Sequence, residues 1–329
     1  MTPHVLALRA LGLGDFLAGV PALRALRAAL PRHRLVLAAP GVLRPLVELS
    51  GTVDELLATG ELQPVPWVGP PPDVAVDLHG NGPASKRLLE RLQPGRLVAF
   101  AGPGGDGRQV PGPTWDPDEH ERMRWCRLVE VAFGVPGDPG DLRLPVPARE
   151  PRVTGAVVLH VGAAFASRRW PEDRFAAVAR AVADAGERVV LTGSGPELPA
   201  LERVRAVAGL PREAVAGRTD LVDLAALVAH ARLVVCGDTG MAHLASAYAT
   251  PSVVLFGPTP PHRWGPPADG PHDVLWHGTG TGDPHGSETD PALLRVPAEE
   301  VLARVRLRLA RPPAGSPPPA ARRSTAPSA

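Results

Sequence analysis

The chain has 329 residues and 44% hydrophobic residues, enough for two domains with a large buried core, which excludes wholesale disorder. Its 35 basic and 34 acidic residues leave a net charge of +1, so a general nucleic-acid binder, which needs a basic excess, is not expected. The two cysteines, Cys126 and Cys236, are too few for a disulfide framework and too far apart for a CxxC metal site.

In the first half of the chain, short apolar runs alternate with stretches of helical periodicity. A strand over 5–9 leads through a turn over 11–15 into a helix over 16–30, which Pro31 stops. Further strands are expected over 35–38, 73–78 and 96–100, further helices over 42–49, 88–92 and 118–133, and a loop over 102–117. A linker rich in proline and glycine over 136–151 marks the domain boundary that we expect.

The second half repeats the pattern. Strands are expected over 156–160, 188–192, 233–236 and 252–256, and helices over 171–185, 198–208, 221–229, 241–248 and 299–309. The segment 258–297 reads as a loop, and 311–329 as a disordered tail of proline, alanine and serine. Strands that alternate with helices predict an α/β chain with two doubly wound parallel sheets, in domains 1–150 and 151–310.

The stretch 233–257 is the centre of the functional argument. A buried strand, the turn 237–240 and a helix leave free backbone N–H groups at the helix start, which is a natural anion site. Asp238, Thr239 and His243 add polar side chains at the same place. The alternative is an ordinary strand–helix–strand unit in which Asp238 or Thr239 only caps the helix. Since ligands of open α/β sheets bind at the carboxyl ends of strands, we expect the site in a cleft between the two domains.

This stretch resembles glycosyltransferase family 9, the heptosyltransferase family with the GT-B fold. Residues 237–245, GDTGMAHLA, with Pro251 and the FGPT of 256–259, are similar to the family's D-[ST]-G-x-x-H-L-A … P … FGPT signature. Weaker matches spread the resemblance over residues 4 to 265: Gly14-Asp15 with Pro21, 168–171, 193–197 and 217–219.

The resemblance implies that domain 151–310 binds a nucleotide-diphosphate sugar and that domain 1–150 holds the acceptor. The residues that it assigns to the donor are Arg168, Glu197, Asp238, Thr239, Gly240 and His243, and those that it assigns to the acceptor are Asn81, Ser85 and Arg87. Arg168 stands in the place of the family's phosphate-binding lysine or arginine, and Glu197 in the place of a ribose contact. The alternatives are a solvated arginine, a carboxylate in a helix's first turn and, for His243, a satisfied buried histidine.

Asp15 is the candidate catalytic base. Glycosyl transfer with inversion needs one carboxylate to take the proton from the acceptor hydroxyl as that hydroxyl attacks the anomeric carbon. An aspartate on a glycine turn at the carboxyl end of a strand points into the cleft. The alternative is that Asp15 only caps the following helix.

The chain departs from the family in the loop after the strand 156–160. Heptosyltransferases often carry hydroxyl residues in this phosphate loop, where this chain has Ala163 and Ala164, and the nearby Ser167 is a possible substitute. The sequence 116–118 matches the D-x-D of metal-dependent glycosyltransferases, but these positions also suit ordinary helix capping, so no metal site is expected.

The sequence therefore predicts a metal-independent, inverting glycosyltransferase for cell-envelope glycans. The expected donor is ADP-linked and the expected acceptor is a glycan or glycolipid. We expect a monomer in the cytoplasm, with peripheral attachment at the inner face of the membrane as an open alternative, because no signal-peptide pattern and no run of ~18 apolar residues is present. Two other functions stay open, a nucleotide-sugar 2-epimerase and a non-catalytic nucleotide-sugar-binding protein.

Overall fold

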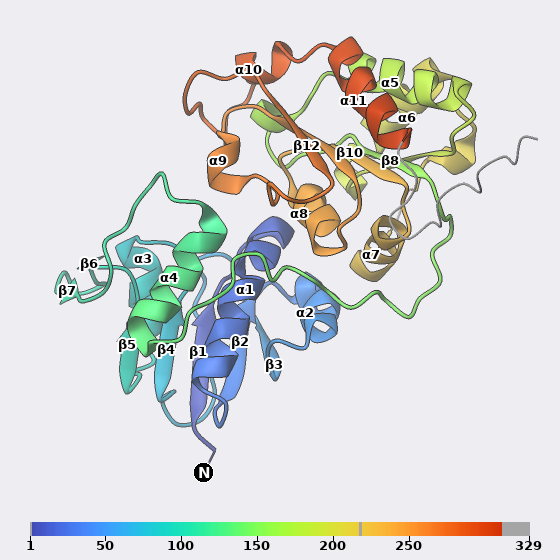
Figure 1. Ribbon diagram of the computed structural model, residues 1–329. Helices are drawn as coiled ribbons and strands as arrows, with labels where there is room; N and C mark the ends of the chain where they lie inside the picture. The colour runs from blue at the N-terminus through green and yellow to red at the C-terminus, as the bar shows by residue number, and fades with distance from the viewer. Residues whose placement is uncertain (1, 217–218, 311–329) are drawn as a thin grey trace, which may run out of the picture.

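Figure 1 shows the computed structural model of the chain, which describes residues 2–216 and 219–310. It contains two five-stranded parallel sheets, one in each half of the chain, and helices that cover them, so the predicted α/β class with two parallel sheets is confirmed. The predicted tail 311–329, and Gly217 and Arg218 of the weakest motif match, lie outside the described residues.

The first sheet has the strand order β3-β2-β1-β4-β5, with β1 at its centre. Its strands are β1 (His4–Leu8), β2 (Arg34–Ala39), β3 (Glu55–Ala58), β4 (Val74–Asp77) and β5 (Arg96–Val98). Leu6 pairs with Val36 on one side and with Ala75 on the other. The helices of this half are α1 (Leu13–Ala29), α2 (Arg44–Ser50), α3 (Pro83–Glu90) and α4 (Glu121–Phe133), with a short turn η1 (Gly41–Leu43).

The second sheet has the strand order β12-β11-β10-β8-β9, with β10 at its centre. Its strands are β8 (Val157–His160), β9 (Val189–Thr192), β10 (Leu233–Gly237), β11 (Ser252–Phe256) and β12 (His272–Trp276). Its helices are α5 (Glu172–Asp184), α6 (Leu198–Ala208), α7 (Leu221–Ala229), α8 (Gly240–Ala247), α9 (Pro261–Trp264), α10 (Pro291–Leu294) and α11 (Ala298–Leu309), and its short turns are η2 (Ala166–Arg168), η3 (Gly195–Glu197) and η4 (Arg212–Ala214). Every residue of β10 and β11 is buried, as expected for strands covered on both faces.

Several sequence expectations need correction. The segment 258–297 is not all loop, because β12 pairs in parallel with β11, and α9 and α10 lie on either side of it. Strand β12 was missed because it begins with His272 and Asp273 and its apolar run is only three residues long, of which Leu275 alone is buried. The loop 102–117 contains a small hairpin, β6 (Gly102–Pro103) with β7 (Gln109–Val110), and β3 was not predicted. Helix α1 begins at Leu13, so Gly14 and Asp15 lie in its first turn rather than in a preceding turn.

The two halves meet through helices α1 and α8, which lie against each other between the sheets in Figure 1. One apolar cluster is shared by both halves, from Leu23 on α1 to Leu244 on α8. This packing brings the carboxyl ends of β1 and β10 toward one region. Within 2–216 and 219–310, no helix combines the length and the apolar character that a membrane crossing requires.

Candidate active site

The first turns of α1 and α8 touch at two glycines. A Cβ added to Gly14 would lie 3.4 Å from the Cα of Gly240 and 2.9 Å from Cδ2 of His243, and one added to Gly240 would lie 3.0 Å from Cβ of Leu13. Each helix follows the carboxyl end of a central strand, β1 or β10. Because each helix start carries free N–H groups and the positive end of a dipole, two such starts in contact form a region that favours anions.

Thr239 is the N-cap of α8, and its hydroxyl accepts a hydrogen bond from the backbone N–H of Met241 at 3.3 Å. The capping alternative for Thr239 is therefore what the structure shows, while Asp238 lies just before the cap with 7% of its surface exposed. Capping of α8 and a ligand contact by Thr239 are compatible, and the ligand contact stays a prediction.

Asp15 lies in the first turn of α1 with 28% of its side chain exposed. Burial raises the pKa of its carboxyl, the Arg9 guanidinium opposes that rise, and the charge of Glu121 adds to it. Hydrogen bonds from the N–H groups of Gly12 and Asp15 also favour the carboxylate. A partly exposed carboxyl with a raised pKa at the mouth of a sheet can accept a proton, which is the property that a general base needs.

Asp238 is the second carboxyl of this region. Its pKa is raised to about 6, chiefly by burial; the Arg168 guanidinium opposes the rise and the charge of Asp15, from the other half of the chain, adds to it. Arg168 is half-buried, and its Nη1 donates to the backbone carbonyl of Asp238 at 3.5 Å. Among the described residues, no partner accepts a hydrogen bond from the buried Nε of Arg168 or satisfies the buried Oγ of Ser167. This side of the region therefore holds donor groups that are not used within the fold.

His243 is neutral at physiological pH. Burial, helped by the nearby charges of Arg122 and Arg9, lowers its pKa to about 3. Its ring packs edge-on against Trp264, with ring centroids 5.7 Å apart. A neutral imidazole next to the α8 N-terminus can donate or accept a hydrogen bond but brings no charge.

Glu197 forms a capping box with Ser194. Its Oε2 accepts from the backbone N–H of Ser194 at 2.6 Å and from the Ser194 hydroxyl at 2.7 Å. The same carboxyl lies over the backbone of Gly162, where an added Cβ would come within 2.0 Å of Oε2. Glu197 thus has the capping role of the alternative interpretation and also lies at the carboxyl end of β8, so its ribose contact stays a prediction.

The three predicted acceptor residues have different surroundings at the end of β4. Ser85 is 2% exposed, and its hydroxyl donates to Oδ2 of Asp77 at 2.7 Å. Asn81 is half-buried and accepts from Nζ of Lys86 at 3.2 Å, whereas the exposed Arg87 donates to the carbonyl of Gly105 at 3.1 Å. Arg87 and Asn81 therefore have surface to offer a ligand, while the Ser85 hydroxyl is used inside the fold.

The D-x-D segment holds its own local bonds. Oδ1 of Asp116 accepts from the N–H of Asp118, and Oδ1 of Asp118 accepts from His262 and from Arg263, both at 2.8 Å. These last two bonds join the two halves of the chain near α4 and α9. In the part of the chain that the structure describes, no three His, Cys, Asp or Glu side chains are grouped so that they could hold a metal ion.

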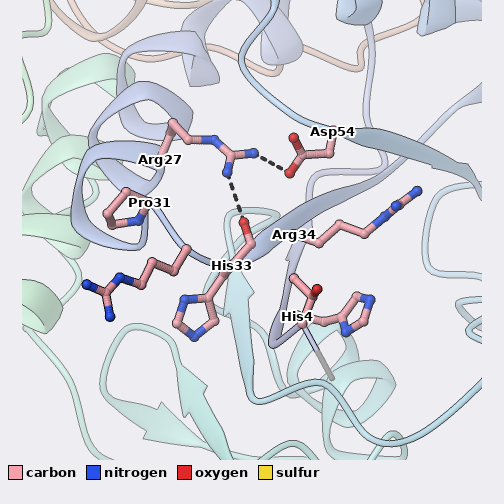
Figure 2. Close-up of a pocket in the computed structure, with 8 residues that line it drawn as sticks. His4, Arg27, Pro31, His33, Arg34 and Asp54 are labelled. Atoms are coloured by element: carbon pink, nitrogen blue, oxygen red, sulfur yellow. Dashed lines mark hydrogen bonds and ion pairs between the residues drawn. The ribbon is translucent and has the colours of Figure 1, made fainter.

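A separate hollow of about 590 Å³ lies at the opposite, amino-terminal edge of the first sheet. Figure 2 shows Arg27 there, turned toward Asp54 and toward the backbone carbonyl of His33. None of the predicted site residues lines it. Because ligands of open α/β sheets bind at the carboxyl ends of the strands, this hollow is not the candidate site.

Sequence reasoning missed the buried charges behind Asp15. Arg9 and Glu121 are buried, and they bond to each other although they lie 112 positions apart in the chain. The available signal was an arginine at the end of an otherwise apolar strand. Asp77 and Lys86 were also missed, although Lys86 is the only lysine of the chain.

A model of glycosyltransferase family 9 (heptosyltransferase) matches residues 115–279, half of the chain. Lipopolysaccharide heptosyltransferase 1 of Pseudomonas aeruginosa is 34% identical over 154 residues, which are 45% of this chain and 42% of that protein. Lipopolysaccharide heptosyltransferase 3 of Escherichia coli is 39% identical over 101 residues, 30% of this chain and 29% of that protein. The matched region thus spans less than half the length of these curated relatives.

Solved structures show the same fold over nearly the whole chain. The E. coli ADP-heptose lipopolysaccharide heptosyltransferase II superimposes with a TM-score of 0.70 at 22% identity and covers 93% of this chain and 98% of that one. A family 9 glycosyltransferase of Veillonella parvula reaches a TM-score of 0.74 at 19% identity, covering 94% and 97%. The arrangement of two parallel sheets is therefore that of GT-B enzymes.

Proposed function

This chain belongs to glycosyltransferase family 9 (heptosyltransferase), and from this premise we propose that it is an inverting glycosyltransferase. It moves a heptose-like sugar from a nucleotide diphosphate to a hydroxyl of a glycan or glycolipid. The observation that carries the proposal is the contact between the α1 and α8 helix starts, with Asp15 on one side and Asp238 and Arg168 on the other.

The chemistry follows from these positions. As the acceptor oxygen attacks the anomeric carbon, its proton passes to the Asp15 carboxylate, and the bond from that carbon to the diphosphate oxygen breaks. The charge that grows on the leaving diphosphate is stabilised by the N–H groups and dipole at the start of α8, worth ~0.3–2 kcal/mol, and by the guanidinium of Arg168. A base on one face of the sugar and a leaving group on the other produce inversion.

The names of the similar proteins suggest the substrates. One related structure is described as E. coli heptosyltransferase WaaC with ADP, and the curated relatives are named for lipopolysaccharide. We therefore propose an ADP-linked donor and a lipopolysaccharide-type acceptor, used at the cytoplasmic face of the membrane. No metal takes part in this proposal, since helix dipoles and an arginine replace it in stabilising the diphosphate.

The test starts with the donor. Purified protein is heated with ADP-, GDP-, UDP- and dTDP-sugars, with and without EDTA; a donor that binds the folded state raises the melting temperature by mass action. We expect a shift with ADP-sugars only, unchanged by EDTA. No shift with any donor, or one abolished by EDTA, contradicts the donor or the metal-free part of the proposal.

Asp15→Asn then tests the base. We expect a fall in transfer rate of about 10²–10⁴-fold, because a positioned base contributes that much, with the donor Kd within about twofold of wild type. Product analysis without acceptor distinguishes transfer from 2-epimerisation of the donor. A variant that folds but transfers at the wild-type rate would exclude Asp15 as the base.

A further inference from the structure

We propose that Arg9 and Glu121 are positioning residues for Asp15, which hold its carboxylate in place and balance its charge from the buried side of α1. This inference rests on the proposed function, in which Asp15 is the base. Neither residue touches the region where the sugar would lie, because both are buried under the first turn of α1.

Arg9 donates hydrogen bonds to three separate segments of the chain. It is 1% exposed; Nε donates to the backbone carbonyl of Asp15, Nη1 to that of Leu78, and Nη2 to Oε1 of Glu121 at 3.0 Å. The first bond holds the backbone of the candidate base itself. Gly19 leaves room for the arginine stem, since a Cβ there would come within 2.9 Å of Cδ of Arg9. The chain thus accommodates a buried cation at the end of a central strand and uses its donors to fix the turn that carries Asp15.

Glu121 is the counter-charge. Its Oε1 also accepts from Nε1 of Trp125 at 2.7 Å, and its Oε2 accepts from Nη1 of Arg124 at 2.5 Å. Both carboxylate oxygens are therefore bonded, and Glu121 lies between two arginines. It neutralises part of the Arg9 charge that would otherwise act on Asp15 alone.

The charges that face Asp15 come from four places. Arg9 at the end of β1 lies with Nη2 3.7 Å from Oδ1 of Asp15, and Glu121 comes from α4. Asp238 approaches from the turn before α8, and the N–H groups of Gly12 and of Asp15 itself point to the carboxylate from its own turn. The cation and the N–H groups favour the ionised base, while burial and the charge of Glu121 oppose it. Arg9 is the cation that acts most strongly on the Asp15 carboxyl.

This balance gives the two residues opposite effects. In Arg9→Gln the Asp15 carboxylate loses its cation but keeps the Glu121 charge, so its pKa rises. As the pH is lowered, Asp15 is then protonated earlier, and the acid limb of the activity profile moves to higher pH. In Glu121→Gln the cation acts unopposed, so the pKa falls and the acid limb moves to lower pH. An opposite charge within ~4–6 Å shifts a carboxyl pKa by about 1–3 units, so we expect the acid limb of kcat/KM to move by about one pH unit in each direction.

The experiment records kcat/KM against pH for wild type, Arg9→Gln, Glu121→Gln and Arg9→Lys, with Arg203→Gln as a control that removes a surface arginine paired with Glu172. In parallel, Asp15 is titrated by NMR in protein labelled with ¹³C at the aspartate γ-carbon. Opposite shifts of the two Gln variants, a wild-type limb in Arg203→Gln and partial rescue by the lysine support the proposal. Shifts in the same direction, or none, overturn it.

Two precautions keep the test decisive. If Arg9→Gln does not fold, Glu121→Gln and Arg9→Lys still carry the prediction, because the first must lower the Asp15 pKa and the second, which keeps a cation, must raise it by less than the one pH unit expected for loss of the cation. If wild type transfers no sugar from any donor, the proposed function fails, yet the NMR titration needs no substrate and still decides whether Arg9 and Glu121 set the charge of Asp15.

Discussion

Two buried carboxyls, Asp77 in the first sheet and Asp238 in the second, differ in how the fold treats them. Both lie at the carboxyl end of a parallel strand, β4 or β10, and burial raises the pKa of each to about 6. Burial and pKa alone therefore do not distinguish these two carboxyls.

Their partners separate them. Asp77 accepts from the Ser85 hydroxyl at 2.7 Å and from the His79 N–H at 3.0 Å, with the cation of Lys86 nearby. For Asp238, no hydrogen bond to the carboxylate is found within 2–216 and 219–310, and the charges near it are those of Arg168 and Asp15. A raised pKa therefore does not identify a functional carboxyl. The useful distinction is whether the fold itself satisfies the group, as for Asp77, or leaves it available to a ligand, as for Asp238.

The largest effect that this comparison predicts is the loss of stability in Asp77→Ala. The substitution removes the shorter of the two acceptors of the buried Ser85 hydroxyl, the acceptor of the half-buried His79 N–H and a counter-charge of the buried Lys86, so we expect the free energy of unfolding to fall by about 3 kcal/mol or more. Urea unfolding at pH 7 measures it, and the donor Kd of the folded fraction should stay unchanged. A loss below about 1 kcal/mol would mean that Asp77 is no more satisfied than Asp238.

Asp238→Asn should act in the opposite direction on stability. Its pKa is about 6 in the folded protein against an ordinary 3.8, so the folded state resists ionisation, and wild type loses stability as pH rises from about 4 to 6. Asparagine does not ionise, so the Asp238→Asn variant does not lose stability over this pH range. We expect it to be more stable than wild type by about 2 kcal/mol at pH 8, with the difference gone near pH 4, and to bind the donor more weakly.

The measurement is urea unfolding of both proteins at several pH values, with Asp77→Asn as the matched control. An asparagine at position 77 would place an amide NH₂ group, which only donates, near the Ser85 hydroxyl and the His79 N–H, which both donate to Asp77. One of these hydrogen bonds would be lost, so Asp77→Asn should lose stability at pH 8. If both Asn variants change stability with the same sign, the distinction drawn between the two carboxyls is wrong.

Parts of this arrangement were predictable from the sequence, and parts were not. Buried central strands show as unbroken apolar runs, and β11 and α7 have the bounds that were predicted for them. The edge strand β12 was missed because edge strands bury few side chains. Asp238, Thr239 and Gly240 were predicted together because they are consecutive.

The bond between Arg9 and Glu121 depends on how α4 packs against α1, which no local pattern encodes. Ser85 shows a related limit. Because α3 begins at Pro83 rather than near residue 88, Ser85 lies inside a helix and its hydroxyl turns to Asp77. The position of a side chain around a helix follows from where the helix starts, and that start was predicted five residues too late.

Arg168→Ala tests the cation next to Asp238. Charge-assisted hydrogen bonds contribute about 1.5–3 kcal/mol, so we expect the donor Kd to rise about tenfold or more. Stability should change little, because Arg168 is half-buried and its contacts among the described residues are one long hydrogen bond and a cation–π contact with the neighbouring Phe165. Isothermal titration with the donor measures the Kd. Arg203→Ala is the control, because it makes the same chemical change at an exposed surface position outside the candidate site. An unchanged Kd would remove Arg168 from the donor site.

The smallest effect concerns Ser167, which comes soon after the two alanines at the phosphate-loop positions. Its side chain is 2% exposed, and its hydroxyl has no partner among the described residues, while its backbone is held separately by Gly286 and Asp290. Ser167→Ala should therefore keep the loop in place and raise the free energy of unfolding by about 0.5–1 kcal/mol, since it removes an unsatisfied buried group. In Ser85→Ala, where the hydroxyl is bonded to Asp77, the same chemical change should lower stability.

If Ser167 supplies the hydroxyl that Ala163 and Ala164 lack, Ser167→Ala also raises the donor Kd about fivefold, the cost of one neutral hydrogen bond. If stability rises and the donor Kd is unchanged, the Ser167 hydroxyl makes no hydrogen bond to the donor. Ser167 would then be excluded as the replacement for the hydroxyl residues of the phosphate loop.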